Sequence, residues 1–242
     1  GQGYTLLQQE EDLNAVLVGG SEASITPLGI TSFHNMKALS PLNEPTASRP
    51  FDKGHSGFVM GEGAGALILE TLEHALRRGA RPLAEIVGYG ATCDAYHVTA
   101  PDPSAQPQAK AIEKALKRAG ITPEQIDYVC AHGTSTPLND VIETKAIKQA
   151  LGDRAYEIPV SSVKSMMGHL LGASGAVETV ATVLAMQEQM VPPTINFQEP
   201  AEECDLYYVP NKAEKRPINY ALKESLGFGG HNSVLVLKRY EG

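Results

Sequence analysis

Three short segments of this chain combine histidine, lysine, hydroxyl groups and glycine in ways that suit chemistry at a carbonyl group. The first is His132-Gly133-Thr134-Ser135-Thr136-Pro137, in which a histidine N–H could donate a hydrogen bond to a carbonyl oxygen. A plain turn whose hydroxyls cap the following helix accounts for the same residues equally well. On spacing alone, this motif is compatible with a site and with an ordinary loop.

The second segment, 164–178, places a lysine, a histidine and a glutamate just before and inside an apolar stretch. A buried carboxylate needs a partner or takes up a proton, and Lys164 is the obvious partner of Glu178. A structural ion pair explains these two residues as well, and it is compatible with a functional role. A single histidine such as His169 is more often a hydrogen-bonded core residue.

The third segment is Gly227-Phe228-Gly229-Gly230-His231-Asn232. Glycines let a backbone approach a ligand closely, and exposed N–H groups can form an oxyanion hole. As an isolated pattern, a glycine-rich turn before a strand is the better explanation.

The elements that must position these segments alternate between strand and helix patterns. Predicted strands cover 15–18, 61–70, 84–90, 126–131, 159–163 and 233–238; predicted helices cover 71–78 and 173–186, and two more end at Gly120 and near Gly152. Asp140 and Glu143 are expected to cap a helix, and 224–231 to form a turn. This alternation predicts α/β layers around a mixed or mostly parallel sheet. Ligands bind outside the carboxyl ends of such strands, so 132–137, 164–175 and 227–232 are predicted to converge there.

The bulk composition excludes several classes of protein. With 42% apolar and 20% charged residues, the 242-residue chain is ordinary for a soluble globular protein. A net charge of -8 argues against nucleic-acid binding. No apolar run predicts a membrane span, and the first residues do not form a signal peptide. Cys93, Cys130 and Cys204 fit neither a zinc nor a disulfide pattern, which indicates reduced thiols and a cytoplasmic location.

Together, the stretches AHGTSTPLND, VSSVKSMMGHLLGASGAVE and LGFGGHN resemble the elongating (type II) β-ketoacyl-acyl-carrier-protein synthases of the thiolase-like superfamily. Further matches are VGGSEASITPLGITSF (18–33), ASRPFDKGHSGFVMGEGAGALILE (47–70), DAYHVTAPDP (94–103) and VPPTINF (191–197). The resemblance covers nearly the whole chain. It implies two similar α/β halves layered α/β/α/β/α, with mixed five-stranded sheets. Residues 1–72 would end the first half, and residues 73–242 would form almost all of the second.

The resemblance implies a decarboxylating Claisen condensation in fatty-acid or polyketide synthesis. An acyl group passes from a carrier-protein thioester to a cysteine, malonyl-carrier protein loses carbon dioxide, and the resulting carbanion attacks the acyl-enzyme. The family's cysteine begins the helix whose remainder would be 3–11, so it is expected shortly before Gly1. None of the three cysteines of this chain matches it, and Cys130 is expected to be a small buried residue. The chain would act with the N-terminal half of the same enzyme.

The resemblance also assigns roles to residues. His132 and His169 match the two histidines that donate hydrogen bonds to the thioester oxygen, Lys164 the lysine that orders the site, and Glu178 its buried partner. Phe228 matches the gating phenylalanine, whose N–H would complete an oxyanion hole. Thr134 and Thr136 match two threonines that hydrogen-bond the phosphopantetheine arm, and Lys37 matches a basic residue where the carrier protein docks. The implied assembly is a homodimer or a ketosynthase heterodimer. No metal or cofactor is implied, because the phosphopantetheine arm belongs to the carrier-protein substrate.

Two positions depart from the family pattern, and two other functions compete with the leading one. Glu224 stands where asparagine is usual and would put a charge near the gating loop, and Leu226 stands where a second phenylalanine is common.

One alternative function is a non-catalytic partner of the chain-length-factor type, against which the His132, Lys164 and His169 set argues. The other is a thiolase-type enzyme that uses coenzyme A, against which the two-histidine pattern and a basic docking residue argue.

Overall fold

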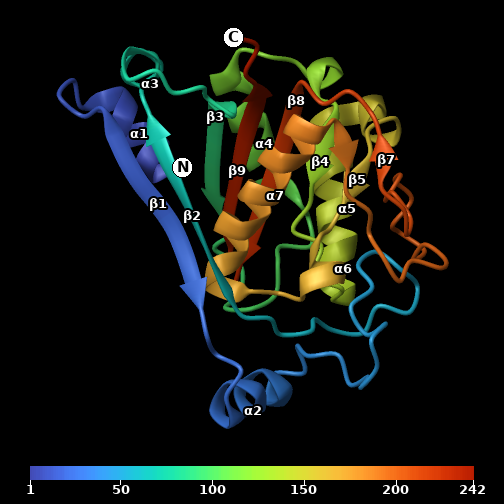
Figure 1. The fold of residues 1–242 in the computed structure, drawn as a ribbon. Helices are drawn as coiled ribbons and strands as arrows, with labels where there is room; N and C mark the ends of the chain where they lie inside the picture. Colours follow the sequence, from blue (N-terminus) through green and yellow to red (C-terminus); the bar gives the residue numbers. More distant parts are fainter.

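A five-stranded mixed sheet forms the centre of the computed structural model, which describes all residues 1–242 (Figure 1). Its strand order is β3 (Ala84–Cys93), β9 (His231–Arg239), β8 (Tyr220–Gly227), β4 (Tyr128–Cys130) and β5 (Val160–Ser161). Strands β3, β9 and β8 pair antiparallel, whereas β8, β4 and β5 pair parallel. This sheet confirms the α/β fold class predicted from the alternation of strand and helix patterns.

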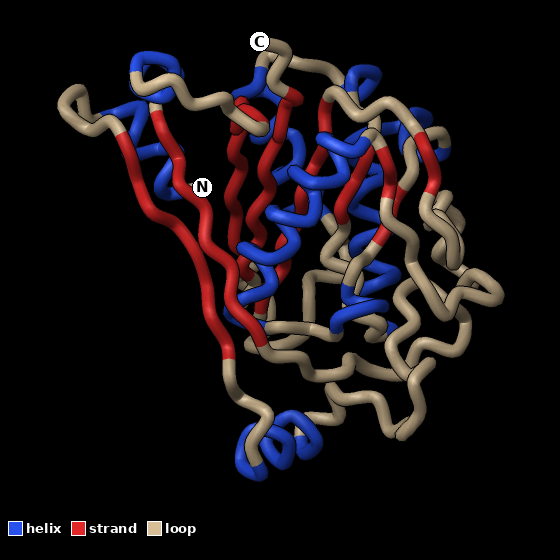
Figure 2. The backbone as a smooth tube through the Cα atoms, viewed as in Figure 1, coloured by secondary structure: helices blue, strands red, loops and turns tan.

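Helices cover both faces of this sheet (Figures 1 and 2). On one face lie α4 (Gln106–Ala119) and α5 (Pro137–Leu151), and on the other lies α7 (Ser174–Glu188). Beyond α7 is a second, antiparallel sheet of β1 (Ala15–Glu22) and β2 (Gly63–Glu70), on which α1 (Gln2–Gln9) packs. Gly20 of β1 is required where this sheet meets the turn before α7, because a Cβ there would lie 2.3 Å from the carbonyl oxygen of Gly172.

The other elements are short and lie around these layers. They are α2 (Pro27–Asn35), α3 (Leu72–Arg77), α6 (Lys164–Met167), the antiparallel pair β6 (Met190–Val191) and β7 (Glu214–Lys215), and the 3₁₀ turns Pro123–Gln125, Gly152–Tyr156 and Leu171–Ala173. The irregular segment 36–62 connects α2 to β2 and passes beneath the strand ends of the central sheet (Figure 2). No helix is long and apolar enough to span a bilayer.

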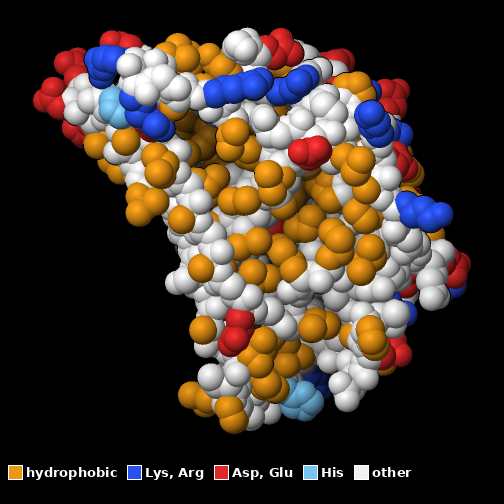
Figure 3. Space-filling view, in the orientation of Figure 1, with side chains coloured by type: hydrophobic (Ala, Val, Ile, Leu, Met, Phe, Trp, Pro, Cys, Tyr) orange, Lys and Arg blue, Asp and Glu red, His pale blue; other side chains and the backbone are white.

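The main apolar core lies between the central sheet and the α4–α5 face. Ile112 of α4, Ile147 of α5 and Val129 of β4 are fully buried in it. The repeat of apolar residues every three or four positions in α4 therefore faces the sheet, as an amphipathic surface helix should. Helix α7 contacts both sheets, which bury part of its apolar surface, but Leu184 remains 55% exposed. The face on which α7 lies in front carries many apolar side chains (Figures 1 and 3).

The segment 224–231 is the one element whose type the sequence pattern predicted wrongly in part. Strand β8 continues through Glu224 to Gly227, where it pairs with His231, and the turn is confined to the residues between them. The strand was missed because it contains two consecutive charged residues, Lys223 and Glu224, which are both buried. They interrupt the polar/apolar alternation from which a strand is recognised in a sequence.

Candidate active site

One cavity of about 620 Å³ receives all three of the segments singled out in the sequence. Its wall includes residues of 132–139, 169–175 and 225–232, completed by parts of 33–38, 56–58 and 94–101. The parallel strand β4 ends directly before the first segment, and the second follows β5. The predicted convergence at the carboxyl ends of the strands is observed.

His132 and His169 face this cavity together. Their ring centroids are 5.2 Å apart, and the ring planes stand at 85°. Phe58 packs its ring edge-to-face on His169 with 5.1 Å between centroids. His169 is also tied through its backbone, because its N–H donates to the carbonyl of Val59 at 2.7 Å. Contacts with the 36–62 segment thus fix the second imidazole relative to the first.

The hydrogen bonds at Nδ1 determine which nitrogen of each neutral imidazole carries the proton. Nδ1 of His132 lies 3.2 Å from the ammonium of Lys164, which can only donate. Nδ1 of His169 accepts the backbone N–H of Leu171 at 3.2 Å and lies 3.0 Å from the hydroxyl of Ser174. Both rings must therefore accept at Nδ1, so both carry their proton at Nε2. The cavity is thereby provided with two imidazole N–H donors.

Burial keeps both imidazoles neutral. Removal from water lowers the pKa of His132 well below its usual range, and the positive charge of Lys164 lowers it further. The pKa of His169 is lowered well below its usual range by the same two causes, in the same order. Neutral N–H donors at neutral pH are what stabilisation of a developing oxyanion requires.

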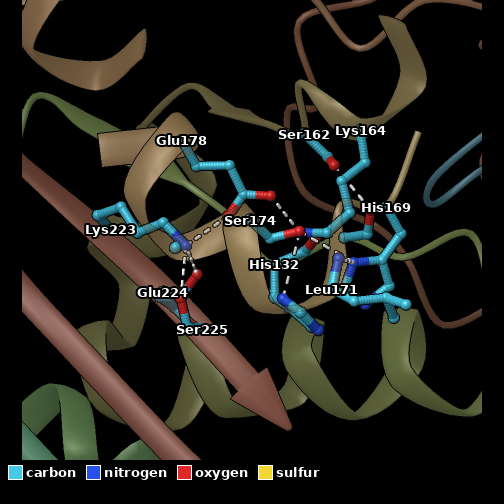
Figure 4. Close-up of polar contacts among 12 residues, drawn as sticks. His132, Ser162, Lys164, His169, Leu171, Ser174, Glu178, Lys223, Glu224 and Ser225 are labelled. Atoms are coloured by element: carbon cyan, nitrogen blue, oxygen red, sulfur yellow. Dashed lines mark hydrogen bonds and ion pairs between the residues drawn. The ribbon is translucent and has the colours of Figure 1, made fainter. Parts of the chain in front are cut away.

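A buried ionic network lies behind His132 (Figure 4). Lys164 is 1% exposed, donates to the carbonyl of His132 at 2.5 Å, and forms an ion pair with Oε1 of Glu178. Burial lowers the pKa of Lys164, while the carboxylate of Glu178 acts in the opposite direction. The predicted partnership of Lys164 with Glu178 is therefore present in the structure.

The sequence patterns missed the second cation of this network. Nζ of Lys223 lies 2.5 Å from Oε2 of Glu178, on the oxygen that Lys164 leaves free. Lys223 is 2% exposed and belongs to the middle of β8. In the sequence, a lysine followed by a glutamate is typical of a solvent-exposed position. Only the three-dimensional structure shows that Lys223 is buried.

Two buried carboxylates hold the loop that carries His132. Glu143 accepts the backbone N–H groups of His132 at 2.5 Å and Gly133 at 2.7 Å, and Asp140 accepts those of Phe51 at 2.8 Å and Ser135 at 3.2 Å. The expectation that Asp140 and Glu143 cap a helix is therefore wrong. They sit inside α5, and the carboxylates serve the loop instead because it passes over the first turns of the helix. Burial raises the pKa of Glu143 to about 7.

The residues assigned to substrate binding surround the cavity mouth. Thr134 and Thr136 line the cavity, and their hydroxyls lie 2.8 Å apart. Lys37 is exposed and lines the cavity from the turn after α2. Phe228 is 47% exposed and packs 6.5 Å, centroid to centroid, from Phe33.

The two departures from the family pattern differ in their placement. Leu226 lines the cavity, where its smaller side chain leaves more room than a phenylalanine would. Glu224 does not line it. Its side chain is 1% exposed, and burial followed by the charge of Glu143 raises its pKa well above the usual range. The charge expected near the gating loop is therefore not placed there.

None of the three cysteines lines the cavity. Cys130 is buried in β4, as expected, and burial raises the pKa of its thiol. Burial likewise raises the pKa of Cys204 to about 12. Cys93 is exposed, and its sulfur lies 3.5 Å from the carbonyl of Gly229. The chain also holds no group of three or more His, Cys, Asp or Glu side chains arranged to bind a metal ion.

Comparisons with known proteins agree with this geometry. Residues 6–75 match the family model described as "Beta-ketoacyl synthase, N-terminal domain", and residues 83–198 match "Beta-ketoacyl synthase, C-terminal domain". A protein of Synechocystis sp. named 3-oxoacyl-[acyl-carrier-protein] synthase 2 is 56% identical over 237 residues, which are 97% of this chain and 57% of that protein. The protein of the same name in Staphylococcus aureus is 50% identical over 242 residues, 100% of this chain and 58% of its own length.

Solved structures give the same result. A type II polyketide acyl-carrier protein in complex with its ketosynthase, AntDE:AntF, aligns with a TM-score of 0.96 and 43% identity, covering 100% of this chain and 60% of that one. A β-ketoacyl synthase from Burkholderia phymatum aligns with a TM-score of 0.93 and 37% identity, covering 100% and 58%. The chain thus spans less than two thirds of the length of these relatives. On these matches, together with two imidazoles facing one cavity, the chain belongs to the β-ketoacyl synthase family.

Proposed function

We propose that residues 1–242 supply the decarboxylation and oxyanion-binding part of a β-ketoacyl-acyl-carrier-protein synthase, an acyltransferase. The observation that carries this proposal is the pair of neutral imidazoles that both present Nε2–H to one cavity.

In this proposal the two histidines hydrogen-bond the thioester oxygen of a malonyl group. The bond from the α-carbon to the carboxylate breaks and carbon dioxide leaves, and the bonding electrons form an enolate whose negative charge falls on that oxygen. Two donors already in place stabilise this charge without reorganisation at the moment of reaction. The enolate carbon then attacks an acyl thioester on a cysteine, the carbon–sulfur bond breaks, and the sulfur leaves as a thiolate.

The acyl-carrying cysteine of this reaction belongs outside residues 1–242. None of the three cysteines here lines the cavity, and burial raises the pKa of two of them, Cys130 and Cys204. A thiol with a raised pKa is a poor nucleophile, since the thiolate is the reactive form. The complete enzyme would therefore pair this part with the N-terminal part of the same protein, in a dimer.

The mouth of the cavity suits an acyl carrier protein as substrate. Thr134 and Thr136, which line the cavity, would hydrogen-bond the phosphopantetheine arm, and the exposed Lys37 would attract an acidic docking surface. Phe228, exposed between the cavity and solvent, would act as the gate. The reaction needs no cofactor beyond the arm of the substrate, and a cytoplasmic location fits it.

The test is condensation by the full-length protein. The protein is incubated with an acylated carrier protein and malonyl-carrier protein, and the products are measured by mass spectrometry. Carbon dioxide and one β-ketoacyl product should form in equal amounts. Acetyl-coenzyme A and malonyl-coenzyme A in place of the carrier proteins should be poor substrates. A protein that condenses only the coenzyme A thioesters, without loss of carbon dioxide, would be a thiolase and would contradict the proposal.

A further inference from the structure

Lys223 is a buried cation inside the sheet, with two hydrogen-bond acceptors and one carboxylate around its ammonium. Its Nζ lies 2.5 Å from Oε2 of Glu178, 2.5 Å from the backbone carbonyl of Glu224 and 2.6 Å from the hydroxyl of Ser225 (Figure 4). The backbone carbonyl and the hydroxyl accept hydrogen bonds from the ammonium, and the carboxylate of Glu178 forms an ion pair with it. The side chain is 2% exposed, so water does not compete for these contacts.

This cation exceeds what the local structure needs. Lys164 and Glu178 already form a buried pair of opposite charge, and Lys223 adds a second positive charge on the same carboxylate. The adjacent Glu224 does not offset this charge, because burial raises its pKa well above the usual range and favours the neutral form. Burying an ion without a counter-ion of its own is unfavourable, and an apolar residue fits the strand better. The register partners of Lys223 are indeed Cys130 and Leu235. A role in the neighbouring site explains why a charge is buried here.

The contacts form a continuous path from Lys223 to the first imidazole. Lys223 holds one oxygen of Glu178, and the other oxygen pairs with Lys164. Lys164 in turn lies 3.2 Å from Nδ1 of His132. Without Lys223, the carboxylate can rotate so that one oxygen is unpaired, and Lys164 is free to follow it. A shift of Lys164 would leave Nδ1 of His132 without the donor that fixes the tautomer.

We propose that Lys223 is a positioning residue of the decarboxylation site, which fixes Glu178 and through it Lys164 and His132, and adds positive charge behind both imidazoles. This inference rests on the proposed function. The excess charge has two effects: it disfavours a second proton on the imidazoles, and it favours the enolate oxygen that they bind. Protonation at Nδ1 would place donor against donor at Lys164 and at the N–H of Leu171.

The charged and titratable groups around the imidazoles come from several elements. Positive charge comes from Lys164 of α6 and Lys223 of β8, and negative charge from Glu178 of α7 and from Glu143 of α5, which has a pKa of about 7. Glu224 of β8 is also buried, and burial raises its pKa well above the usual range, which favours its neutral form. The neutral thiol of Cys130 lies beside Lys223 on β4. Of these groups, Lys164 and Lys223 both lower the pKa of His169, and Lys223 also lowers that of His132.

The decisive comparison is Lys223→Met against Lys238→Met in the full-length protein. Met is an unbranched side chain of nearly the same length and removes the charge. Lys238 is the control, because it lies on the adjacent β9 with its side chain 42% exposed and 3.9 Å from Glu85. Histidine ¹³Cε1–¹H NMR titration should show the pKa of His169 rising by about one pH unit in Lys223→Met, and unchanged in the control. This readout needs no substrate, so it stands even if the protein has a different activity.

Activity supplies the second readout. Carbon dioxide release from malonyl-carrier protein should fall about tenfold in Lys223→Met through kcat, with KM unchanged, because positioning is lost and substrate contacts are kept. The acid limb of the pH profile should move to higher pH with the histidine pKa. If Lys223→Met does not fold, Lys223→Gln retains a donor to Glu178 and should show the same pKa shift. Unchanged histidine titrations in the folded variants would overturn the inference.

Discussion

The ring of His132 stands edge-on to that of His169, with 5.2 Å between centroids and 85° between planes. Each ring has its Nδ1 occupied by a group that can only donate, the ammonium of Lys164 in one case and the N–H of Leu171 in the other. The arrangement therefore fixes two Nε2–H donors toward the same cavity before any substrate arrives, which is the basis of the predictions that follow.

Replacing His169 by alanine in the full-length enzyme should separate the two half-reactions. Loss of one preorganised donor should reduce carbon dioxide release from malonyl-carrier protein by about 10²–10³-fold. Acyl transfer to the cysteine should fall by less than tenfold, because no enolate forms in that step. Rapid-quench assays of the two steps provide the measurement, with His74→Ala, on the surface helix α3, as control. An equal loss of both steps would show that His169 does not act on the enolate.

Removal of the charge at Glu178 should destabilise the protein. Glu178→Gln leaves two buried ammonium groups without their shared anion, so the free energy of unfolding should fall by about 3–5 kcal/mol. The matched control is Glu73→Gln, whose partner Arg77 is 3.6 Å away on the surface, and it should change little. Urea unfolding followed by circular dichroism measures both. Similar stabilities of the two variants would mean that the buried network is not held by Glu178.

The pH dependence of stability should reveal the raised pKa of Glu143, which is about 7 against an ordinary 4.5. A folded-state pKa above the unfolded value contributes stability that is present below pH 4.5 and is lost as the pH rises to about 7. The difference in unfolding free energy between wild type and Glu143→Gln should therefore decrease by about 3 kcal/mol across this window. A difference that is flat with pH would show that Glu143 titrates normally.

Alanine at position 133 should displace the loop that carries His132. Gly133 has φ of +40°, and a Cβ there would lie 2.5 Å from Cβ of Ser162. Gly120 is the control, because it has φ of +67° with open space around it. Gly120→Ala adds backbone strain alone, so Gly133→Ala should cost about 2 kcal/mol more in unfolding free energy. Equal costs in thermal or urea unfolding would mean that the loop accommodates the methyl group.

Charge reversal at Lys37 should weaken the encounter with carrier protein. In Lys37→Glu, kcat/KM for malonyl-carrier protein should fall and lose part of its salt dependence, because an acidic partner is now repelled. Hydrolytic or decarboxylating turnover of a short malonyl-pantetheine thioester should be unaffected. The control is Lys117→Glu, an exposed residue in the last turn of α4 that does not line the cavity. Loss of activity with both substrates would assign Lys37 a role other than docking.

Much of the fold was predictable because apolar periodicity reports directly on burial. Ile112 and its neighbours in α4, and the run that becomes β4, follow the expected patterns. The burial of Lys223 and Glu224 could not be predicted from the sequence. A lysine in a strand is buried only where another element supplies a partner, which for Lys223 is Glu178. Likewise, the bond from Phe51 to Asp140 joins residues far apart in sequence, so nothing local distinguishes that carboxylate from a helix cap.

Carbon dioxide release from malonyl-carrier protein, by full-length protein whose acyl-carrying cysteine is replaced by alanine, tests the central claim most directly. If His132 and His169 stabilise the enolate, this variant should still decarboxylate, since the donors are independent of the nucleophile. Adding His132→Ala and His169→Ala together should then abolish release above the uncatalysed rate. Undiminished release from the variant without the two histidines would contradict the account.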